Sequence, residues 1–392
     1  MQVHFETSQD VVRRLAPEVP VYCVCPRILQ DGAEAFLAGF PGRVLYAVKA
    51  NPMAAVLDGL YAGGLRHFDT ASLNEIALIS GRYPEAGCYF MHPVKGWDAI
   101  HAAYHRHGVR HFVVDHQDEL DKHRQVLGGT PEDLVTVVRL ATEGGDALFD
   151  LSGKFGAQPE EAARLLSQTA AGGGRVGLAF HVGSQCTAPE SYARAFERVR
   201  EVLARAPVRL DCLDVGGGFP VSYGSPVPSN EHFFRTIREG LERLALPTGC
   251  EVLCEPGRAL VARGMSLITQ IHRRRGDALT LNDGIYGSLR GATIGMRYPS
   301  RLLRSGGPVG GEERAFTIYG PTCDGLDVLP YEIELPAEAG PGDWIEFGLV
   351  GAYTNTLVSG FNGFRPDIAV TVEQGFAPAP SEAAADMEEV AP

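Results

Sequence analysis

Lys49 is the residue whose chemistry can be read most directly from its neighbours. It follows a short apolar run, Val44–Val48, and precedes Ala50-Asn51-Pro52. The run predicts a buried strand and the proline favours the start of a helix, so the amine should project into a cleft above a sheet. A desolvated lysine loses its proton more easily and can attack a carbonyl carbon. Lys49 is therefore a candidate for a covalent bond to a carbonyl ligand, against the ordinary alternative of a solvated surface charge.

Three glycine-containing runs follow predicted strands and could hold an anion. Gly216-Gly217-Gly218 comes after Asp214-Val215 and exposes backbone amides on residues without side chains. The runs His181-Val182-Gly183-Ser184 and Glu255-Pro256-Gly257-Arg258 add a hydroxyl and a guanidinium group. A glycine triplet alone fits a tight turn as well as it fits phosphate, but three such runs favour a bound dianion.

Glu255 and His181 extend this pattern to an aromatic ring. Glu255 ends an apolar strand, where an ionised carboxylate is costly unless it meets a proton donor or a cation. A pyridinium nitrogen would be a suitable partner. His181 would be placed to stack on the ring, although an isolated histidine is more often a core residue. A lysine, a phosphate cradle and a buried acid together indicate pyridoxal 5′-phosphate (PLP) as the cofactor.

A second group of candidate residues lies in the last third of the chain. Cys323 is flanked by Asp324 and Asp327, while Tyr286 and Tyr353 belong to two further motifs rich in glycine. Turn formation explains the glycines and prolines of these motifs but not a thiol between two carboxylates. A thiol can donate a proton to a carbanion, and a carboxylate can hold the ammonium group of a substrate.

The elements that must position these residues follow a regular alternation. Between residues 44 and 255, eight short apolar runs alternate with segments of helical periodicity, which predicts a (β/α)8 barrel of the α/β class. Polar residues recur at the C-terminal ends of the runs, where such barrels build their active sites, so the candidates should meet in one cleft. The runs are 44–49, 66–69, 88–92, 111–115, 135–140, 176–181, 212–215 and 251–255.

The pattern changes after about residue 264. Short alternating runs at 315–318, 331–335, 344–347 and 368–372 are broken by Gly, Pro and Asp and predict an all-β domain. We expect the PLP-binding barrel to span residues 24–264, and the β domain to combine residues 265–376 with a strand from residues 1–23. The segment 377–392, rich in Ala, Pro and Glu, should be disordered.

Composition narrows the class of protein further. A chain of 392 residues exceeds the usual size of one hydrophobic core, and 45% hydrophobic with 21% charged residues is typical of a globular protein. A net charge of −13 without a long basic run argues against nucleic acid as a partner. We recognise no signal peptide or membrane span, and expect a cytoplasmic protein. Eight scattered cysteines indicate neither a disulfide framework nor a zinc site, so no metal is expected.

Taken in order, the motifs resemble those of the fold-type III PLP-dependent decarboxylases, the ornithine, diaminopimelate and arginine decarboxylase family, whose barrel is alanine-racemase-like. The resemblance covers almost the whole chain and includes Tyr46–Lys49, Gly320–Asp327 and Phe361-Asn362-Gly363-Phe364. It implies that Lys49 carries PLP, that His181 stacks on the ring and that Glu255 pairs with its nitrogen. It also implies that the cofactor pocket is lined by Asp69, Arg139, Lys154, Ser184, Gly217, Gly218, Gly257, Arg258 and Tyr353.

The resemblance further implies decarboxylation of a basic L-amino acid. Cys323 would donate a proton and, with Asp324, would come from the partner subunit, so that a homodimer shares two sites. Tyr286, Asp324 and Gly295 should lie near the side chain of the substrate. Gly295 stands where the family's eukaryotic ornithine enzymes carry an aspartate, so one carboxylate is missing. Ornithine is the first expectation, lysine or another amino acid is the alternative, and diaminopimelate is less favoured.

Two other functions are compatible with such a barrel. An amino-acid racemase would use a PLP lysine and an opposing acid, but would not be expected to carry the Cys-Asp-Gly-Leu-Asp motif at 323–327. A non-catalytic, decarboxylase-like regulatory protein would be expected to lose cofactor residues that this chain keeps. Both functions are therefore less favoured than decarboxylation.

Overall fold

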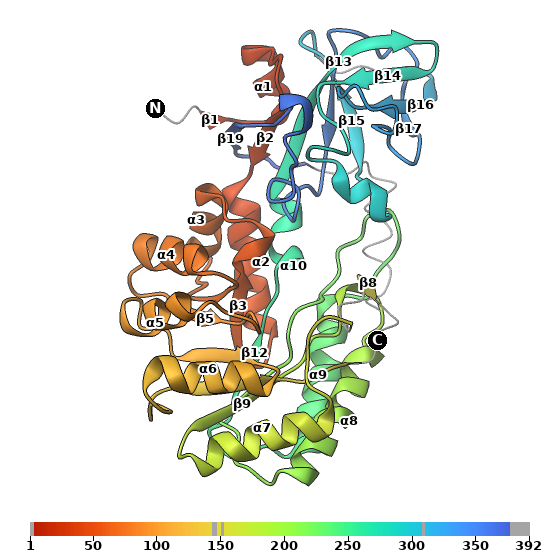
Figure 1. The fold of residues 1–392 in the computed structure, drawn as a ribbon. Helices are drawn as coiled ribbons and strands as arrows, with labels where there is room; N and C mark the ends of the chain where they lie inside the picture. Colours follow the sequence, from red (N-terminus) through yellow and green to blue (C-terminus); the bar gives the residue numbers. More distant parts are fainter. Residues whose placement is uncertain (1–3, 143–146, 150–152, 308–309, 377–392) are drawn as a thin grey trace.

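A closed barrel of eight parallel strands forms the larger part of the computed structural model, which describes residues 4–142, 147–149, 153–307 and 310–376 (Figure 1). The strands follow one another around the barrel in the order β11-β12-β3-β4-β5-β6-β7-β9. Each predicted run overlaps one of them, so the predicted (β/α)8 barrel is confirmed. They are β3 (Arg43–Ala47), β4 (His67–Thr70), β5 (Gly87–Phe90), β6 (His111–Val114), β7 (Val135–Arg139), β9 (Arg175–Ala179), β11 (Cys212–Asp214) and β12 (Glu251–Cys254).

Helices connect the barrel strands and cover the outside of the barrel (Figure 1). Their first turns carry the expected local signals: Pro26 opens α2, and the Oγ atom of Ser72 accepts a hydrogen bond from the Glu75 amide at the start of α4. The helices are α2 (Pro26–Gly39), α3 (Ala54–Ala62), α4 (Leu73–Arg82), α5 (Trp97–His105), α6 (Gln117–Leu127), α7 (Pro159–Ala171), α8 (Glu190–Arg205), α9 (Asn230–Leu244) and α10 (Arg258–Val261).

The barrel strands are buried on both faces, which explains why they appear in the sequence as uninterrupted apolar runs. In β3, Leu45 belongs to the same hydrophobic cluster as Val113 and Leu253 of other barrel strands, whereas its neighbour Tyr46 belongs to the large cluster that includes the surrounding helices. A Cβ atom at Gly177 would lie 2.4 Å from the Cys212 sulfur. Glycine in β9 therefore makes room for this cysteine, which serves as a small core residue.

The second part of the molecule is built around a nine-stranded sheet. In it β13 pairs with β2, β14 and β18, and β2 continues through β19 to β1. The strands are β1 (His4–Phe5), β2 (Val21–Val24), β13 (Met265–Arg275), β14 (Ala278–Leu281), β15 (Ser300–Leu303), β16 (Glu313–Tyr319), β17 (Ile333–Pro336), β18 (Trp344–Phe347) and β19 (Ile368–Val372).

The N-terminal segment contributes more to this sheet than the single strand expected. It supplies β1, β2 and a helix between them, α1 (Ser8–Leu15), whose Ser8 hydroxyl donates to the buried carboxylate of Glu346 at 2.7 Å. Because β2 ends at Val24, one residue of the range predicted for the barrel lies in this sheet. The domain limits 24–264 and 1–23 with 265–376 stay a prediction, and the expected disordered tail 377–392 lies outside the described residues.

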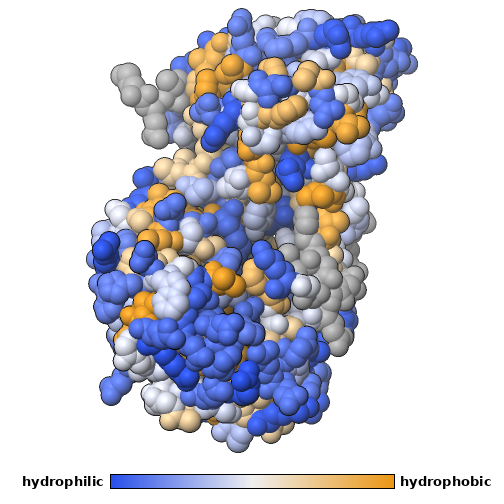
Figure 2. Space-filling view, viewed as in Figure 1, coloured by the Kyte–Doolittle hydropathy of each residue, from blue (hydrophilic) through white to orange (hydrophobic). Residues whose placement is uncertain are grey.

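The β domain lies over the C-terminal ends of the barrel strands. The Tyr353 amide donates to the Ala50 carbonyl at 2.9 Å, and the Asn51 side chain donates to the Gly351 carbonyl at 2.8 Å. Apolar residues gather on both sides of this junction in the space-filling view (Figure 2). The loop after β3 is therefore covered by the β domain. None of the helices formed by the described residues is long and apolar enough to cross a membrane.

Candidate active site

Lys49 is one of only four lysines in the chain, and its ammonium group lies 2.8 Å from the Asp69 carboxylate. It sits in a single 3-10 turn, η1 (Val48–Ala50), rather than at the end of the strand, because β3 ends at Ala47. The Lys49 side chain is 44% exposed, whereas that of Asp69 is 1% exposed. A buried carboxylate thus anchors an amine that solvent can still reach.

The ionisation of Lys49 differs from the expectation drawn from its burial. Loss of solvent lowers its pKa, but the charges of Asp69 and Glu255 outweigh that effect, so the net pKa is raised above its usual value. The prediction that desolvation makes this amine a free nucleophile is therefore wrong for the cofactor-free protein. The amine stays protonated while the surrounding carboxylates keep their charge.

Asp69, Asp214 and Glu255 form an acidic cluster around Lys49. Burial and the neighbouring carboxylates raise the pKa of Glu255 well above its usual range, and burial raises the pKa of Asp214 to about 7. The Asp214 Oδ1 atom accepts from the Gly216 amide at 2.7 Å, while its Oδ2 atom and Oδ1 of Asp69 have no hydrogen-bond partner among the described residues. This excess of carboxylate over cation fits a protonated ring nitrogen as the missing partner.

Asp214 is a site residue that sequence reasoning missed. Its position at the end of a strand, directly before the glycine triplet, was the available signal. The sequence alone does not show that the Asp214 carboxylate turns back to the glycine loop and towards Glu255. The structure shows it fully buried.

His181 has a neutral ring. Its Nδ1 atom accepts a hydrogen bond from the Gly183 amide at 3.0 Å. Burial, together with the positive charges of Arg139 and Lys49, lowers the pKa of the imidazole well below its usual value. A flat, uncharged ring beside the lysine can stack on an aromatic ligand without adding a charge to it.

The glycine loops are packed so closely that side chains would collide with the backbone. A Cβ atom at Gly217 would lie 2.4 Å from the Glu255 carbonyl oxygen, and one at Gly218, where φ is 114°, would lie 2.6 Å from the Gly183 carbonyl oxygen. The three predicted anion-binding runs, 181–184, 216–218 and 255–258, therefore meet at one place. Exposed amides in such a loop are a suitable cradle for phosphate.

Arg258 supplies a cation to the same region. It is 5% exposed, donates to the Tyr223 hydroxyl at 3.2 Å, and its guanidinium carbon lies 5.0 Å from the centre of the Tyr353 ring. Its Nε atom has no partner, and no carboxylate pairs with it, among the described residues. A Cβ atom at Gly257 would lie 3.3 Å from the Tyr353 hydroxyl. A buried guanidinium without a protein anion fits a phosphate ligand.

Arg139 and Lys154 share an aromatic platform at the edge of the site. The Arg139 guanidinium carbon lies 5.6 Å, and the Lys154 ammonium 4.8 Å, from the centre of the Phe155 ring. The ring of His92 meets the same phenyl group edge-on at 5.5 Å. Neither cation has an ion pair within the described part of the chain.

Cys323, Asp324 and Tyr286 form a separate group in the β domain. Asp324 accepts a hydrogen bond from the Tyr286 hydroxyl, and Cys323 is the one exposed thiol among the eight free cysteines. Across the described residues, no hydrogen bond or ion pair joins this group to Lys49. The single chain thus assembles the predicted cofactor residues but does not bring the predicted proton donor to them.

Neither Asp327 nor Gly295 offers a carboxylate to a substrate. Asp327, which flanks Cys323 in the sequence, is buried and accepts hydrogen bonds from backbone amides, so it is not available to a substrate ammonium. Gly295 ends the 3-10 turn η3 (Arg290–Ile294) with φ of 92°, and among the described residues a Cβ atom there would meet only the Leu148 side chain, at 3.7 Å. No carboxylate of the described residues lies within 4 Å of such an atom.

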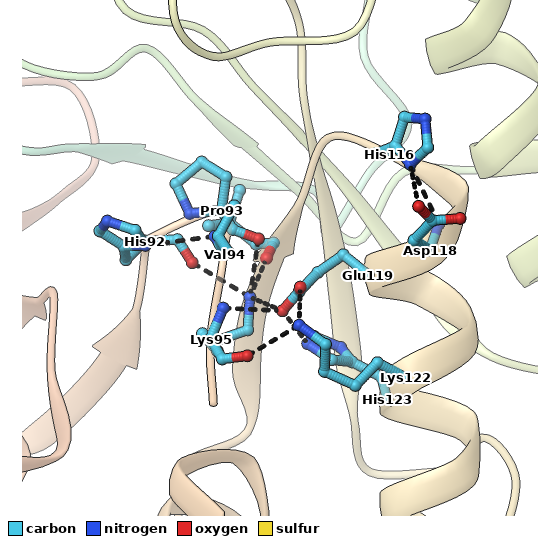
Figure 3. A network of polar contacts seen from close by, with 10 residues as sticks. His92, Pro93, Val94, Lys95, His116, Asp118, Glu119, Lys122 and His123 are labelled. Atoms are coloured by element: carbon cyan, nitrogen blue, oxygen red, sulfur yellow. Dashed lines mark hydrogen bonds and ion pairs between the residues drawn. The ribbon is translucent and has the colours of Figure 1, made fainter. Parts of the chain in front are cut away.

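A buried ionic network supports the barrel loop that carries His92 (Figure 3). The Lys95 ammonium donates to the carbonyls of His92 and Val113 at 3.0 and 2.5 Å and lies 3.0 Å from the Glu119 carboxylate. Lys122 lies 2.5 Å from the other oxygen of Glu119. The His123 Nε2 atom is 3.4 Å from Glu119, longer than a normal hydrogen bond, so the two lysines are the main partners of this carboxylate.

Comparison with known proteins agrees with this geometry. The profile described as "Pyridoxal-dependent decarboxylase, pyridoxal binding domain" matches residues 29–262. The chain is 35% identical to ornithine decarboxylase of Schizosaccharomyces pombe (82% of this chain, 75% of the relative). It is 31% identical to lysine/ornithine decarboxylase of Selenomonas ruminantium (92% of each). The crystal structure of Paramecium bursaria Chlorella virus arginine decarboxylase bound to agmatine superposes with a TM-score of 0.82 at 28% identity, covering 92% of this chain and 98% of that one.

Two independent lines therefore meet at the barrel mouth. The lysine, the unpaired carboxylates and the anion cradle fit PLP, and the matched profile spans more than half of the chain. The fold, over most of the chain, is shared with an arginine decarboxylase, and the sequence is similar to decarboxylases named for ornithine and for lysine/ornithine. The chain belongs to the fold-type III PLP-dependent amino-acid decarboxylases, is similar to ornithine decarboxylase, and is a lyase that uses pyridoxal 5′-phosphate.

Proposed function

We propose that this enzyme decarboxylates L-ornithine to putrescine and CO2. The observation that carries the proposal is the pairing of a PLP-type barrel site with a half-buried carboxylate, Asp324, beside the one exposed thiol among the eight cysteines. A carboxylate suits the distal ammonium group of a diamino acid. Relatives named for ornithine and for lysine/ornithine support the same substrate class. Lysine is the second candidate, because the absence of an acid at Gly295 leaves room for a longer side chain.

The barrel residues divide the work of holding the cofactor. Lys49 would bind it covalently, while Asp69 holds the amine in place at 2.8 Å. Glu255 would hold the ring nitrogen through a charge-assisted hydrogen bond, and the neutral His181 would cover one face of the ring. When bound, PLP supplies an electron sink for the pair left behind as CO2 departs. The carboxylate cluster would keep that nitrogen protonated and so would favour loss of CO2.

The phosphate would be held away from the reacting bond. Ser184, Gly217, Gly218, Gly257, Arg258 and Tyr353 would hold it. The amides of the glycine loops and the buried Arg258 guanidinium would fix the dianion on elements that are themselves packed against the barrel. Rigid binding at this remote group orients the reacting end of the substrate and excludes water from it.

We also propose that the active unit is a homodimer with two shared sites. Cys323 would donate a proton to the carbon that has lost CO2, and Asp324 with Tyr286 would hold the distal ammonium group, all from the partner subunit. Two observations support this arrangement: among the described residues no hydrogen bond or ion pair joins the Cys323 group to Lys49, and exposed apolar side chains lie around the Cys323 group. These are Leu326 (71% exposed), Phe361 (41%), Phe364 (42%) and Tyr319 (39%). Such a surface favours burial against a second copy.

Shared sites predict complementation between two inactive chains. Lys49→Ala and Cys323→Ala homodimers should each be impaired, but a mixture should regain part of the native activity through hybrid dimers with one intact site. Activity is measured after subunit exchange has been verified with differently tagged chains. Verified hybrids without recovered activity would contradict the shared site.

The substrate is tested by a direct product screen. PLP-loaded enzyme is incubated with ornithine, lysine, arginine, diaminopimelate, 2,4-diaminobutyrate and neutral or acidic amino acids, and loss of CO2 is scored by mass spectrometry. Putrescine as the dominant product is the expected result. Cadaverine as the dominant product would show that lysine, rather than ornithine, is the preferred substrate. An amine from a neutral or acidic substrate would show that the absent acid at Gly295 has changed the substrate class.

A further inference from the structure

The loop that carries Cys323 is fixed at its base by a buried carboxylate. Asp327 is 2% exposed. Its Oδ1 atom accepts from the Ile285 amide at 3.1 Å, and its Oδ2 atom accepts from the amide and hydroxyl of Thr322 at 3.1 and 2.7 Å. Cβ atoms at Gly284 and Gly320 would lie 2.3 and 2.2 Å from the same carboxylate. Asp327 therefore ties the segment of Tyr286 to the segment of Cys323.

The tip of the loop is held by a different side chain. The backbone amide of Cys323 donates to Oδ1 of Asn362 at 3.1 Å, and this is the only hydrogen bond to that amide in the described part of the chain. Asn362 lies in the middle of the 3-10 turn η4 (Phe361–Gly363) with φ of 54° and ψ of 13°. Asparagine tolerates this left-handed conformation better than most residues. The conformation turns its amide towards the loop.

The η4 turn is in turn attached to Tyr286. The amide and hydroxyl of Ser359 donate to the Tyr286 carbonyl at 3.1 and 2.8 Å, and the Phe361 ring lies 5.0 Å from the Tyr286 ring. Tyr286 itself donates to Asp324. Three segments, 284–288, 320–327 and 359–364, thus form one unit. Within it, Asn362 binds the backbone of Cys323, and Tyr286 binds the side chain of Asp324.

We propose that Asn362 is a positioning residue for the Cys323 thiol, an inference that rests on the proposed role of Cys323 as proton donor. Asn362 does not touch the reacting atoms. It fixes the backbone from which the thiol projects, so that Sγ–H meets the carbon that has lost CO2 and the resulting thiolate regains a proton from water. A displacement of the donor by about 1 Å is enough to slow such a transfer.

Misplaced protonation has its own product. When the proton goes to the cofactor carbon instead of the substrate carbon, hydrolysis by water releases an aldehyde and leaves the amino group on the cofactor. The ratio of aldehyde to amine therefore measures where the proton was delivered. A change confined to overall stability would lower both products together and leave the ratio unchanged.

The test uses two variants at one position and a matched control. Asn362→Gly allows the left-handed backbone but removes the acceptor, whereas Asn362→Asp keeps an acceptor oxygen. Ala245→Gly is the control, because Ala245 also has a positive φ, 46°, and ends helix α9 on the exposed surface. On the PLP-loaded full-length enzyme, hydrogen exchange of the peptide that contains Cys323 is measured together with the aldehyde-to-amine ratio from the best substrate.

Asn362→Gly should speed exchange of that peptide and raise the aldehyde-to-amine ratio about tenfold, as expected for a donor that has lost its alignment. Asn362→Asp and Ala245→Gly should leave both close to native. Unchanged exchange or an unchanged ratio in Asn362→Gly would overturn the inference, as would an Asn362→Asp variant that behaves like Asn362→Gly. The Cys323→Ala variant distinguishes failure of the proposed proton donor from failure of the positioning role of Asn362. If this variant forms amine without extra aldehyde, the proposed role of Cys323 fails and the inference on Asn362 fails with it. If Cys323→Ala raises the ratio and Asn362→Gly does not, only the inference fails.

Discussion

Two buried charged clusters in the same barrel differ in how their charges balance. Around Glu119, the carboxylate has two lysine partners, and the Lys95 ammonium is surrounded by carbonyl oxygens (Figure 3). Burial opposes ionisation of Glu119, but its neighbours lower its pKa to about 2. Burial lowers the pKa of Lys95 to about 8, with Glu119 opposing the shift. Both charges of this cluster therefore have partners within the protein, although the ring nitrogens of the neighbouring His123 make no hydrogen bond among the described residues.

The cluster around Lys49 is not satisfied in this way. Three carboxylates, Asp69, Asp214 and Glu255, share one nearby lysine, and two of their oxygen atoms have no hydrogen-bond partner among the described residues. Burial raises the pKa values of Asp214 and Glu255 rather than lowering them. Burial of charge therefore does not by itself mark a site. A ligand-binding site is indicated instead by a buried charge for which the chain itself supplies no partner.

Replacing Lys49 should have the largest effect on function. Lys49→Ala is expected to lower turnover by several orders of magnitude and to remove the near-violet absorbance of bound PLP, because none of the other three lysines forms an ion pair with this cluster among the described residues. Lys49→Arg is the matched control, since it keeps a cation against Asp69 but cannot form the covalent bond. It should fold like the native chain and remain inactive. Activity retained in either variant would show that Lys49 does not carry the cofactor.

Breaking the balanced cluster should have the largest effect on stability. Glu119→Gln leaves the Lys95 ammonium buried without its counter-charge and is expected to cost about 3 kcal/mol of unfolding free energy. Urea denaturation of the two proteins measures the difference. Lys122→Ala, which removes the more exposed partner, should cost less. A Glu119→Gln protein as stable as the native chain would mean that carbonyl oxygens alone suffice for Lys95.

The unbalanced cluster predicts a smaller effect of opposite sign and a pH dependence. The folded-state pKa of Asp214, about 7, lies above its usual value of 3.8, so the folded state holds an extra proton and loses stability as the pH rises through this interval. In the PLP-free protein, Asp214→Asn should be more stable than native at pH 8, and this advantage should disappear as the pH falls to 4. Urea denaturation at several pH values tests this. A difference that does not grow with pH would show that Asp214 is ionised throughout.

How much of the fold could be predicted depended on how each strand is buried. Barrel strands such as β3 and β7 are apolar on both faces and flanked by helices, so their runs are visible in the sequence. In the β domain, β18 and β19 were predicted with the bounds found, at 344–347 and 368–372. The long β13 was not, because its second half, ending in Arg273–Arg275, is polar and exposed. The pairing of β2 with β13 and β19 joins distant segments, which no local pattern encodes.

The sequence predicted which residues form the candidate site better than it predicted their ionisation. Lys49, His181 and Glu255 follow strands whose ends meet in any closed barrel, so their proximity could be anticipated. The raised pKa of Lys49 could not, because it depends on the distances to Asp69 and Glu255. Asp327 is adjacent in sequence to the predicted proton donor, yet its side chain turns inward. Direction at that scale is set by backbone turns, which the sequence does not specify.

The scarcity of lysine noted above makes this protein convenient to label. Of the four side-chain amines, that of Lys95 is fully buried and that of Lys122 is paired with Glu119, which leaves those of Lys49 and Lys154 open to solvent. Nearly all other cationic side chains are arginines, which do not react with aldehydes as amines do. Borohydride reduction after loading with one equivalent of PLP should therefore place the label on Lys49, with Lys154 as the other open side-chain amine. Measuring the label on the Lys49 peptide by mass spectrometry gives the fraction of competent sites in any preparation.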